Sequence, residues 1–350
     1  MKIAMLNLSN NITDFSTVSS SETIQIAMVL RKSGFDVDVI SKTNGDNTIS
    51  FEKVKDINEY DVLMVVNGSI NFFGGQPNPI ILNNFKLMAK FNKRIYYLLT
   101  DLGMPFRQLE HDKLVEWGTS NEEVKITSPI LIVSQSQNID MIKHMHRNEP
   151  QVDKVVYFPL ERYFLFNELF LRSGIITTRT CDLIYGGSFR AGRREKKMKK
   201  FLFDMEDLKV EFFGSAKEDQ FEKDYQVAPI FTGKVDNKDV VKKFSEGLAT
   251  IIIGDPKYEG SMITLRVWET FMSESVAFID NDFDPEHNLM INDFFYVNEK
   301  DDLIRKIRLL KQNPTIATDL KQFQFARVYN LFNKQEYIEM IRKLIYENQN

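Results

Sequence analysis

Apolar residues in the first half of the chain follow two alternating patterns. Short runs rich in β-branched and other apolar residues predict strands at residues 2–6, 35–40, 61–66, 94–99 and 129–133. Between them, residues 21–31 and 80–91 carry apolar side chains at three- and four-residue spacing, which is typical of helices with one face in a core. Strands that alternate with helices indicate a parallel sheet with crossover helices. We therefore expect residues 1–165 to form one doubly wound domain.

The second half repeats this pattern after an extended segment, residues 155–159, and a polar, aromatic stretch. Strands are predicted at residues 182–185, 209–213, 250–253, 276–279 and 294–297, and helices at 240–248 and 303–310. The tail, residues 319–346, is helical in pattern throughout. We expect a second domain at 166–332 and a C-terminal helix, 333–350, that returns to the first domain. The predicted fold is α/β, with two Rossmann-like domains facing a central cleft that binds the ligand.

Composition narrows the class of protein. The 350 residues are 43% hydrophobic and 27% charged, which is typical of globular domains. The single cysteine, Cys181, excludes an internal disulfide and indicates a reducing compartment, so we expect a cytoplasmic protein. Apolar stretches all fall short of the roughly 20 residues that a membrane span needs. The net charge of −4 argues against a broad surface that binds nucleic acid, because phosphate backbones are held mainly by lysine and arginine. The basic cluster at 190–200 is typical of a solvated helix face.

A glycine-containing segment, residues 185–194, follows a predicted strand and opens a helix. Gly187 would let a phosphate approach the backbone, and Arg190 and Arg194 can lie on one helix face, so two guanidinium groups would suit a diphosphate. The segment lacks the Gly-x-Gly-x-x-Gly and Walker patterns, so neither NAD binding nor P-loop hydrolysis is supported. The alternative is a glycine turn followed by a surface helix.

A second candidate site follows the strand predicted at 250–253. Arg266 and Glu269 are three residues apart on the next helix and share a face. An arginine directed at phosphates beside a glutamate that accepts both ribose hydroxyls would grip a nucleotide, because a carboxylate can accept two hydrogen bonds. A surface ion pair is the alternative for this spacing.

Two features of the first half suggest acceptor chemistry. Asp101 follows the strand predicted at 94–99 and can act as the general base of an inverting sugar transfer, or equally as a turn or helix cap. The loop at 71–75 carries Phe72 and Phe73 beside two glycines. Exposed rings there would stack on a ligand or base, whereas core packing of at least one ring is the alternative.

Two short patterns resemble metal ligands and have simpler explanations. Asp282 and Asp284 form an Asp-x-Asp sequence, which a polar turn explains. His144 and His146 are two residues apart and diverge on the helix that their surroundings predict. The sequence assigns no metal ligands.

Taken together, these segments resemble the DNA β-glucosyltransferases of T-even bacteriophages, which glucosylate 5-hydroxymethylcytosine in duplex DNA. The similarity runs nearly end to end and rests on residues 20–24 (SSETI), 69–75 (SINFFGG), 96–101 (YYLLTD), 184–190 (IYGGSFR), 212–214 (FFG), 231–234 (FTGK) and 263–270 (ITLRVWET). The resemblance implies a GT-B fold, UDP-glucose as donor, inversion at the anomeric carbon, a divalent cation such as Mg²⁺ or Mn²⁺, and flipping of the target base out of the duplex.

The resemblance also implies roles for individual residues. Asp101 would be the catalytic base. The residues at the diphosphate would be Arg190, Arg194, Arg266, Gly187 and Ser188. Glu269 would hold the ribose, and the remaining donor contacts would be Val18, Glu22, Phe213, Gly214, Val235 and Tyr258. Asn71 and Phe73 would belong to the loop that enters the DNA.

The resemblance implies a monomeric enzyme in the cytoplasm of an infected bacterium that shields phage DNA from restriction. One alternative is a GT-B transferase that uses another UDP-sugar or a non-DNA acceptor; the acidic net charge and Gly103, where the family pattern has a basic residue, motivate it. A noncatalytic DNA-binding module is a further alternative, and Asp101 beside a diphosphate grip argues against it.

Overall fold

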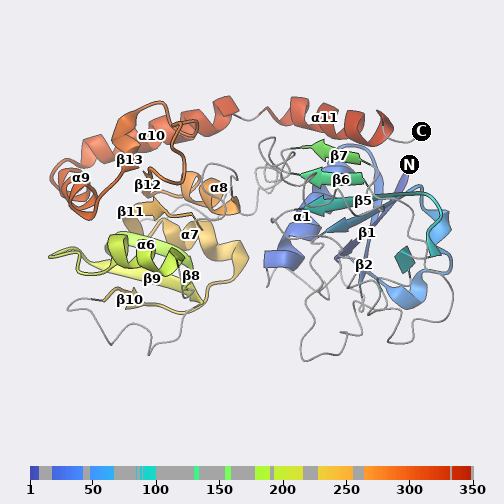
Figure 1. Cartoon of the computed structure of the whole chain (residues 1–350), viewed down its shortest axis with the longest axis horizontal. Helices are drawn as coiled ribbons and strands as arrows, with labels where there is room; N and C mark the ends of the chain where they lie inside the picture. Colours follow the sequence, from blue (N-terminus) through green and yellow to red (C-terminus); the bar gives the residue numbers. More distant parts are fainter. Residues whose placement is uncertain are drawn as a thin grey trace. The chain divides into compact units, whose positions relative to one another are not determined.

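The computed structural model divides into two compact units, residues 1–166 with 334–350, and residues 167–333 (Figure 1). It describes residues 1–7, 18–41, 48–66, 84, 87, 88, 90–99, 130–133, 154–158, 178–189, 193–215, 228–254, 264–331 and 333–347.

The first unit contains a seven-stranded parallel sheet in the order β3-β2-β1-β4-β5-β6-β7. Its strands are β1 Lys2–Asn7, β2 Asp36–Ser41, β3 Ile49–Ser50, β4 Val62–Val66, β5 Arg94–Leu99, β6 Ile130–Val133 and β7 Lys154–Tyr157. The five predicted strands are confirmed, and the extended segment at 155–159 contributes most of β7. The sequence pattern missed β3 because two residues carry no periodicity.

The helices of the first unit include one from each end of the chain. Those with described bounds are α1 Val18–Lys32 and α11 Lys334–Glu347, with short 3₁₀ turns at Phe51–Lys53 and Ile57–Glu59. Residues 84, 87, 88 and 90, within the helix predicted at 80–91, are helical as well. The guanidinium of Arg342 donates to the Ser33 carbonyl at 2.7 Å, and the rings of Phe158 and Tyr337 lie 5.2 Å apart. The tail helix therefore packs on the first unit, as expected from its sequence.

The second unit contains a six-stranded parallel sheet in the order β10-β9-β8-β11-β12-β13. Its strands are β8 Cys181–Ser188, β9 Val210–Ser215, β10 Ile230–Phe231, β11 Gly247–Ile252, β12 Val276–Asp280 and β13 Tyr296–Val297. Its helices are α6 Arg193–Leu202, α7 Val240–Phe244, α8 Leu265–Phe271, α9 Lys300–Gln312 and α10 Pro314–Leu331, with 3₁₀ turns at Asn237–Asp239 and Asp293–Phe295.

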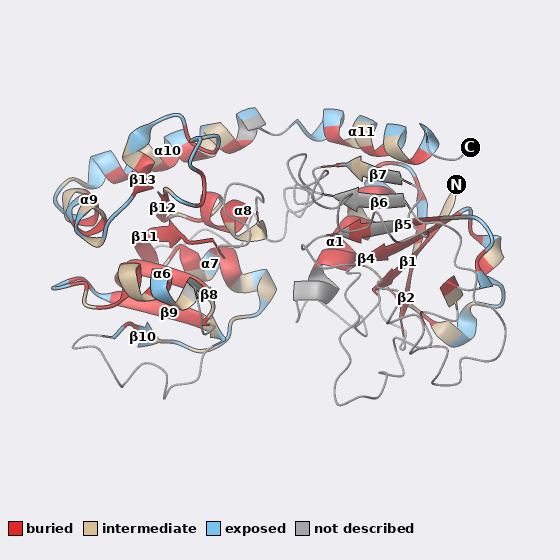
Figure 2. Ribbon diagram, viewed as in Figure 1, coloured by how far each residue is buried: buried red, intermediate tan, exposed pale blue. Residues whose placement is uncertain are grey.

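The central strands of both sheets are buried on both faces (Figure 2). Every residue of β4, β11 and β12 is buried, as expected for parallel strands covered by helices on each side. In the described part of the chain, no helix combines the length and apolar character needed to cross a membrane.

Several predicted boundaries in the second unit were wrong. The strand predicted at 294–297 is reduced to Tyr296–Val297, because Asp293–Phe295 form a 3₁₀ turn. The helix predicted at 240–248 ends at Phe244, and Leu248 lies in β11, because Gly247 begins a fully buried strand there. Gly186, Gly187 and Ser188, predicted as a loop, are strand residues that pair with Phe213, Gly214 and Ser215 of β9. Apolar periodicity cannot detect a strand that ends in glycines.

Close packing between β8 and β9 requires glycine at positions 186 and 214. A Cβ atom on Gly186 would lie 2.3 Å from the ring of Phe213. Gly214 has φ +131°, and a Cβ atom there would lie 1.8 Å from the carbonyl oxygen of Gly187. Both the backbone conformation and the available space therefore exclude a side chain at Gly214.

We expect Gly214→Ala to destabilise the second unit by about 3 kcal/mol, because overpacking adds to the strain of positive φ. Gly233→Ala is the matched control: Gly233 has φ +85° with nothing within 4 Å of an added Cβ, so about 1 kcal/mol is expected. Urea unfolding followed by Trp268 fluorescence in a Trp117→Phe background measures the difference. Equal costs for the two variants would contradict the steric argument.

Candidate functional site

Several predicted site residues lie at the carboxyl edge of the second sheet. Because the strands are parallel and in register, β8 and β9 end together, with Ser188 opposite Ser215. The amide of Phe189 continues the pairing by donating to the Ser215 carbonyl at 2.8 Å. Ligands of open parallel sheets bind beyond this edge. Gly187 and Ser188 are partly exposed there.

A helix follows β8, as the sequence predicts, and its first residue is Arg193. Arg190 and the side chain of Arg194 lie outside the described residues, as do Tyr258, Asp101, Asn71 and Phe73. Val18 is the first residue of α1, and its side chain is likewise not described. Glu22 lies one turn into α1 and is buried.

Two of the predicted nucleotide contacts belong to the hydrophobic core. Phe213 is 2% exposed and packs edge-on against Phe244 with ring centroids 4.9 Å apart. Val235 is partly buried against the same cluster, which also contains Cys181 and Val240. A ligand at this position would therefore contact the backbone around Phe213 and Gly214 rather than the Phe213 ring.

Arg266 and Glu269 form an ion pair on α8, with an N–O distance of 2.8 Å. Glu269 is buried, whereas the Arg266 side chain is 28% exposed, so the pair is not the exposed surface pair that its spacing also allowed. The guanidinium lies over the ring of Phe244, 5.1 Å from its centroid. Phe244 was missed by the sequence analysis, because nothing local distinguishes it from other core aromatics.

Burial raises the pKa of the Glu269 carboxyl, and the charge of Arg266 opposes this rise. Arg266 thus favours the charged form of a carboxyl that is itself buried. One guanidinium edge is held by Glu269 while Arg266 retains further N–H donors. These remaining donors could bind an anionic group.

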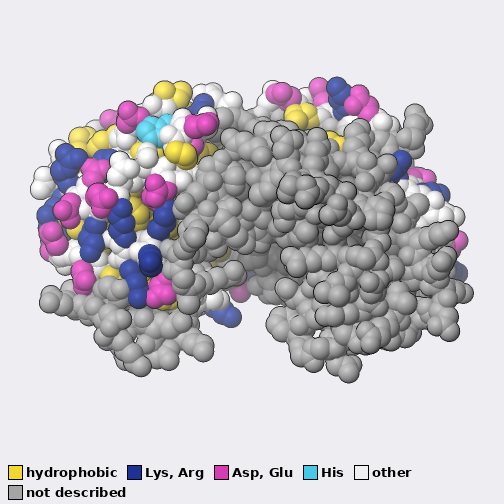
Figure 3. Space-filling model, in the orientation of Figure 1, with side chains coloured by type: hydrophobic (Ala, Val, Ile, Leu, Met, Phe, Trp, Pro, Cys, Tyr) yellow, Lys and Arg dark blue, Asp and Glu magenta, His cyan; other side chains and the backbone are white. Residues whose placement is uncertain are grey.

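The basic cluster on α6 is largely neutralised by neighbouring acids. Lys197 lies 2.6 Å from Asp280 and 3.0 Å from Asp282, and Lys199 pairs with Glu195 at 2.6 Å. Over the described part of the face in Figure 3, basic and acidic side chains are interspersed. Lys197 therefore connects α6 to Asp280 and Asp282, whereas Lys199 pairs within the helix.

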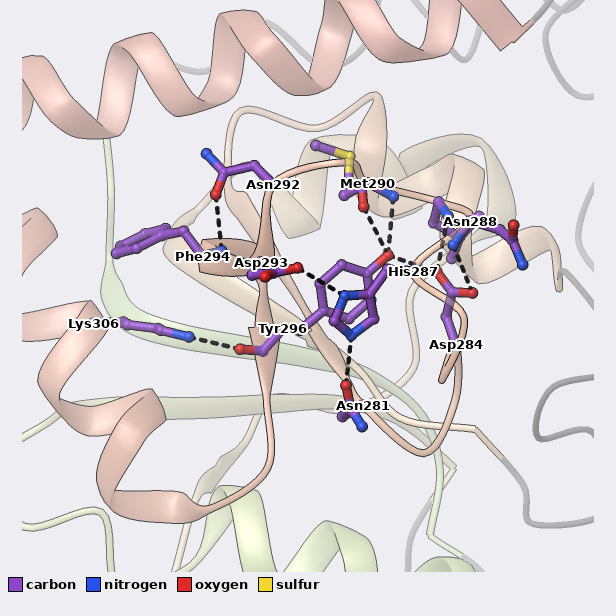
Figure 4. A network of polar contacts seen from close by, with 11 residues as sticks. Asn281, Asp284, His287, Asn288, Met290, Asn292, Asp293, Phe294, Tyr296 and Lys306 are labelled. Atoms are coloured by element: carbon purple, nitrogen blue, oxygen red, sulfur yellow. Dashed lines mark hydrogen bonds and ion pairs between the residues drawn. The ribbon is translucent and has the colours of Figure 1, made fainter.

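The Asp-x-Asp sequence has a structural role, as the polar-turn interpretation expected. Asp284 accepts hydrogen bonds from the Leu289 amide at 2.8 Å and from the Tyr296 hydroxyl at 2.6 Å (Figure 4). The His287 ring stacks on Tyr296 with centroids 3.7 Å apart. Asp282 pairs with Lys197, so the two carboxylates serve different contacts.

The chain is similar to known proteins in sequence and in structure. Residues 1–164 match the family model described as bacteriophage T4 β-glucosyltransferase. The chain is 44% identical over 340 residues to the DNA β-glucosyltransferase of Enterobacteria phage T4, covering 95% of each protein. It is similar to two solved structures of the T4 phage enzyme, one of a mutant with UDP-glucose (TM-score 0.89, 40% identity) and one with UDP and Mn²⁺ (TM-score 0.86, 40% identity). Each comparison covers 98% of this chain and 99% of the other.

We expect Arg266→Met to lower the free energy of unfolding by an amount that grows as the pH rises. Without Arg266 the pKa of folded Glu269 rises further above its ordinary value of 4.5, so above that pH the folded variant retains a proton that the unfolded chain has lost. The variant therefore loses stability as the pH increases. The difference in free energy of unfolding between the unsubstituted protein and the variant should be about 1–2 kcal/mol larger near neutral pH than near pH 4.5.

Urea unfolding at the two pH values, again followed by Trp268 fluorescence, tests this expectation. Adding Glu269→Gln is the control, since the titrating group is then absent and the cost of Arg266→Met should become independent of pH. A cost that is the same at both pH values with Glu269 present would contradict the coupling.

Proposed function

The chain belongs to the bacteriophage T4 β-glucosyltransferase family, and from this membership we propose that it transfers glucose from UDP-glucose to the hydroxymethyl group of 5-hydroxymethylcytosine in duplex DNA. The chain is a glycosyltransferase with the GT-B fold, built from two parallel-sheet units. Transfer would invert the configuration at the anomeric carbon.

The observation that carries this proposal is the extent of the similarity. Identity of 44% spans 95% of both proteins, so the half with Asp101 and the half with the Arg266–Glu269 pair are both matched. The structure with UDP-glucose supports the same donor here. Similarity of fold alone would be weaker support for this activity, because proteins with the same fold can have many different functions.

The second unit would bind the donor at the carboxyl edge of its sheet. Arg266, with Arg190 and Arg194, would neutralise the diphosphate, while Glu269 would accept the ribose hydroxyls. Gly187 and Ser188 would support the phosphates at the end of β8, and Gly214, Val235 and Tyr258 would surround the nucleotide with the backbone at Phe213. Val18 and Glu22 of α1 would complete the donor contacts.

Asp101 would supply the general base. The acceptor hydroxyl oxygen forms a bond to the anomeric carbon as the bond from that carbon to the UDP oxygen breaks, and the hydroxyl proton passes to the Asp101 carboxylate. UDP leaves as an anion whose growing charge the arginines stabilise. For the hydroxymethyl group to reach Asp101, the base must leave the duplex, with Asn71 and Phe73 in the loop that enters the DNA.

A divalent cation would assist this reaction, as the complex of the T4 enzyme with UDP and Mn²⁺ suggests. The described residues do not fit a protein-built metal site, because they contain no group of three His, Cys, Asp or Glu side chains placed to hold an ion. The nearest motif, Asp282 and Asp284, is committed to other contacts.

The biological setting proposed for this activity is the cytoplasm of an infected bacterium. There the enzyme would act as a monomer on phage DNA, and the added glucose would block restriction enzymes.

The direct test is to incubate the protein with UDP-glucose, Mg²⁺ and duplex DNA containing 5-hydroxymethylcytosine, then weigh the digested nucleosides by mass spectrometry. A hexose on that nucleoside, and on no other, is expected. No transfer despite tight UDP binding would overturn the acceptor or the sugar and favour another UDP-sugar or acceptor.

We expect Asp101→Asn to lower turnover by about 10²–10⁴-fold, because an amide cannot accept the proton of the attacking hydroxyl. The affinity for UDP, measured by calorimetry, should change little, since Asp101 belongs to the acceptor half. Turnover equal to that of the unsubstituted protein would remove Asp101 from its assigned role.

A further inference from the structure

A buried lysine lies behind the helix that carries Arg266 and Glu269. Lys321 of α10 is 4% exposed. Its ammonium donates to the Phe271 carbonyl at 2.9 Å and makes a longer contact of 3.5 Å with the Thr270 carbonyl. Phe271 is the last residue of α8, and Thr270 precedes it. Lys321 therefore caps the carboxyl end of α8 from a neighbouring helix.

Burying this charge is unfavourable unless the group has a function or strong partners. Among the described residues, no acidic side chain forms an ion pair with the ammonium, and the Phe325 ring lies 4.4 Å from it. Burial lowers the pKa of Lys321 to about 7, and the charge of Glu274 opposes this shift. An apolar residue would fill the position at lower cost to stability.

The helix that Lys321 holds has seven residues, about two turns. Glu269 lies two residues before the capped carbonyl of Phe271, and Arg266 lies one turn earlier. A shift of the last turn would therefore move both side chains. The position of Lys321 is itself fixed, because Gln324, one turn further along α10, exchanges hydrogen bonds with the amide and carbonyl of Ala277 in β12 at 3.1 and 2.7 Å.

We infer that Lys321 is a positioning residue of the donor site: it holds the end of α8 so that Arg266 and Glu269 keep the orientation that UDP requires. This inference rests on the donor site proposed above. Lys321 touches neither substrate nor reacting atoms, and it acts through α8.

The test compares Lys321→Met with a matched control, Lys306→Met. Lys306 is a buried lysine of α9 that donates to the Tyr296 carbonyl of β13 at 2.6 Å, away from α8. Lys321→Met should weaken UDP binding about tenfold near pH 6. It leaves the Phe271 carbonyl without its partner but also removes an unpaired buried charge, so its urea midpoint should fall less than that of Lys306→Met, which in addition loses the ion pair with Asp302. Lys306→Met should lower the midpoint and leave the Kd for UDP within about twofold.

The pH dependence gives a second measurement. As the pH rises from about 6 to about 9, Lys321 loses its proton, and the ratio of the Kd values of Lys321→Met and the unsubstituted protein should fall towards about twofold. Lys321→Arg, which keeps a charged donor at both pH values, should retain UDP binding and lack this dependence. If Lys321→Met does not fold, the inference is still tested by comparing the pH dependence of the Kd for UDP between Lys321→Arg and the unsubstituted protein.

Unchanged UDP affinity in Lys321→Met, a ratio that does not vary with pH, or losses of stability and affinity that match those of Lys306→Met would each overturn the inference. Absence of UDP binding by the unsubstituted protein would instead contradict the donor site itself, and with it the premise of the inference.

Discussion

The close approach of β8 and β9 at their carboxyl ends is the constraint on which the candidate site depends. The carbonyl of Gly187 occupies the space that a Cβ of Gly214 would need, so the two strands stay paired to their last residues. Because the strands end together, Phe189, the first residue after β8, is bonded to Ser215 at the end of β9.

The helices around this edge are held by lysines directed into the protein. Lys197 connects α6 to Asp280 at the end of β12, and Lys321 connects α10 to the end of α8. Each ammonium satisfies an oxygen that burial would otherwise leave without a partner.

The proposed chemistry divides between the two units in a physically consistent way. The donor leaves as an anion and needs guanidinium groups, of which Arg266 is oriented by the buried Glu269. The acceptor must lose a proton and needs a carboxylate, which Asp101 would provide.

The sequence by itself determined the two parallel sheets, because strand and helix periodicities are local properties of the chain. It also determined the family, because segments such as 184–190 and 263–270 combine rare residue types in a fixed order. Tertiary structure alone decided that Gly186–Ser188 extend a strand, that the ring of Phe213 packs in the core, and that Lys197 and Lys321 hold functional helices. Those outcomes depend on contacts between residues tens of positions apart, such as Gly187 with Gly214 and Lys321 with Phe271, and no local pattern encodes which distant atom fills the neighbouring space.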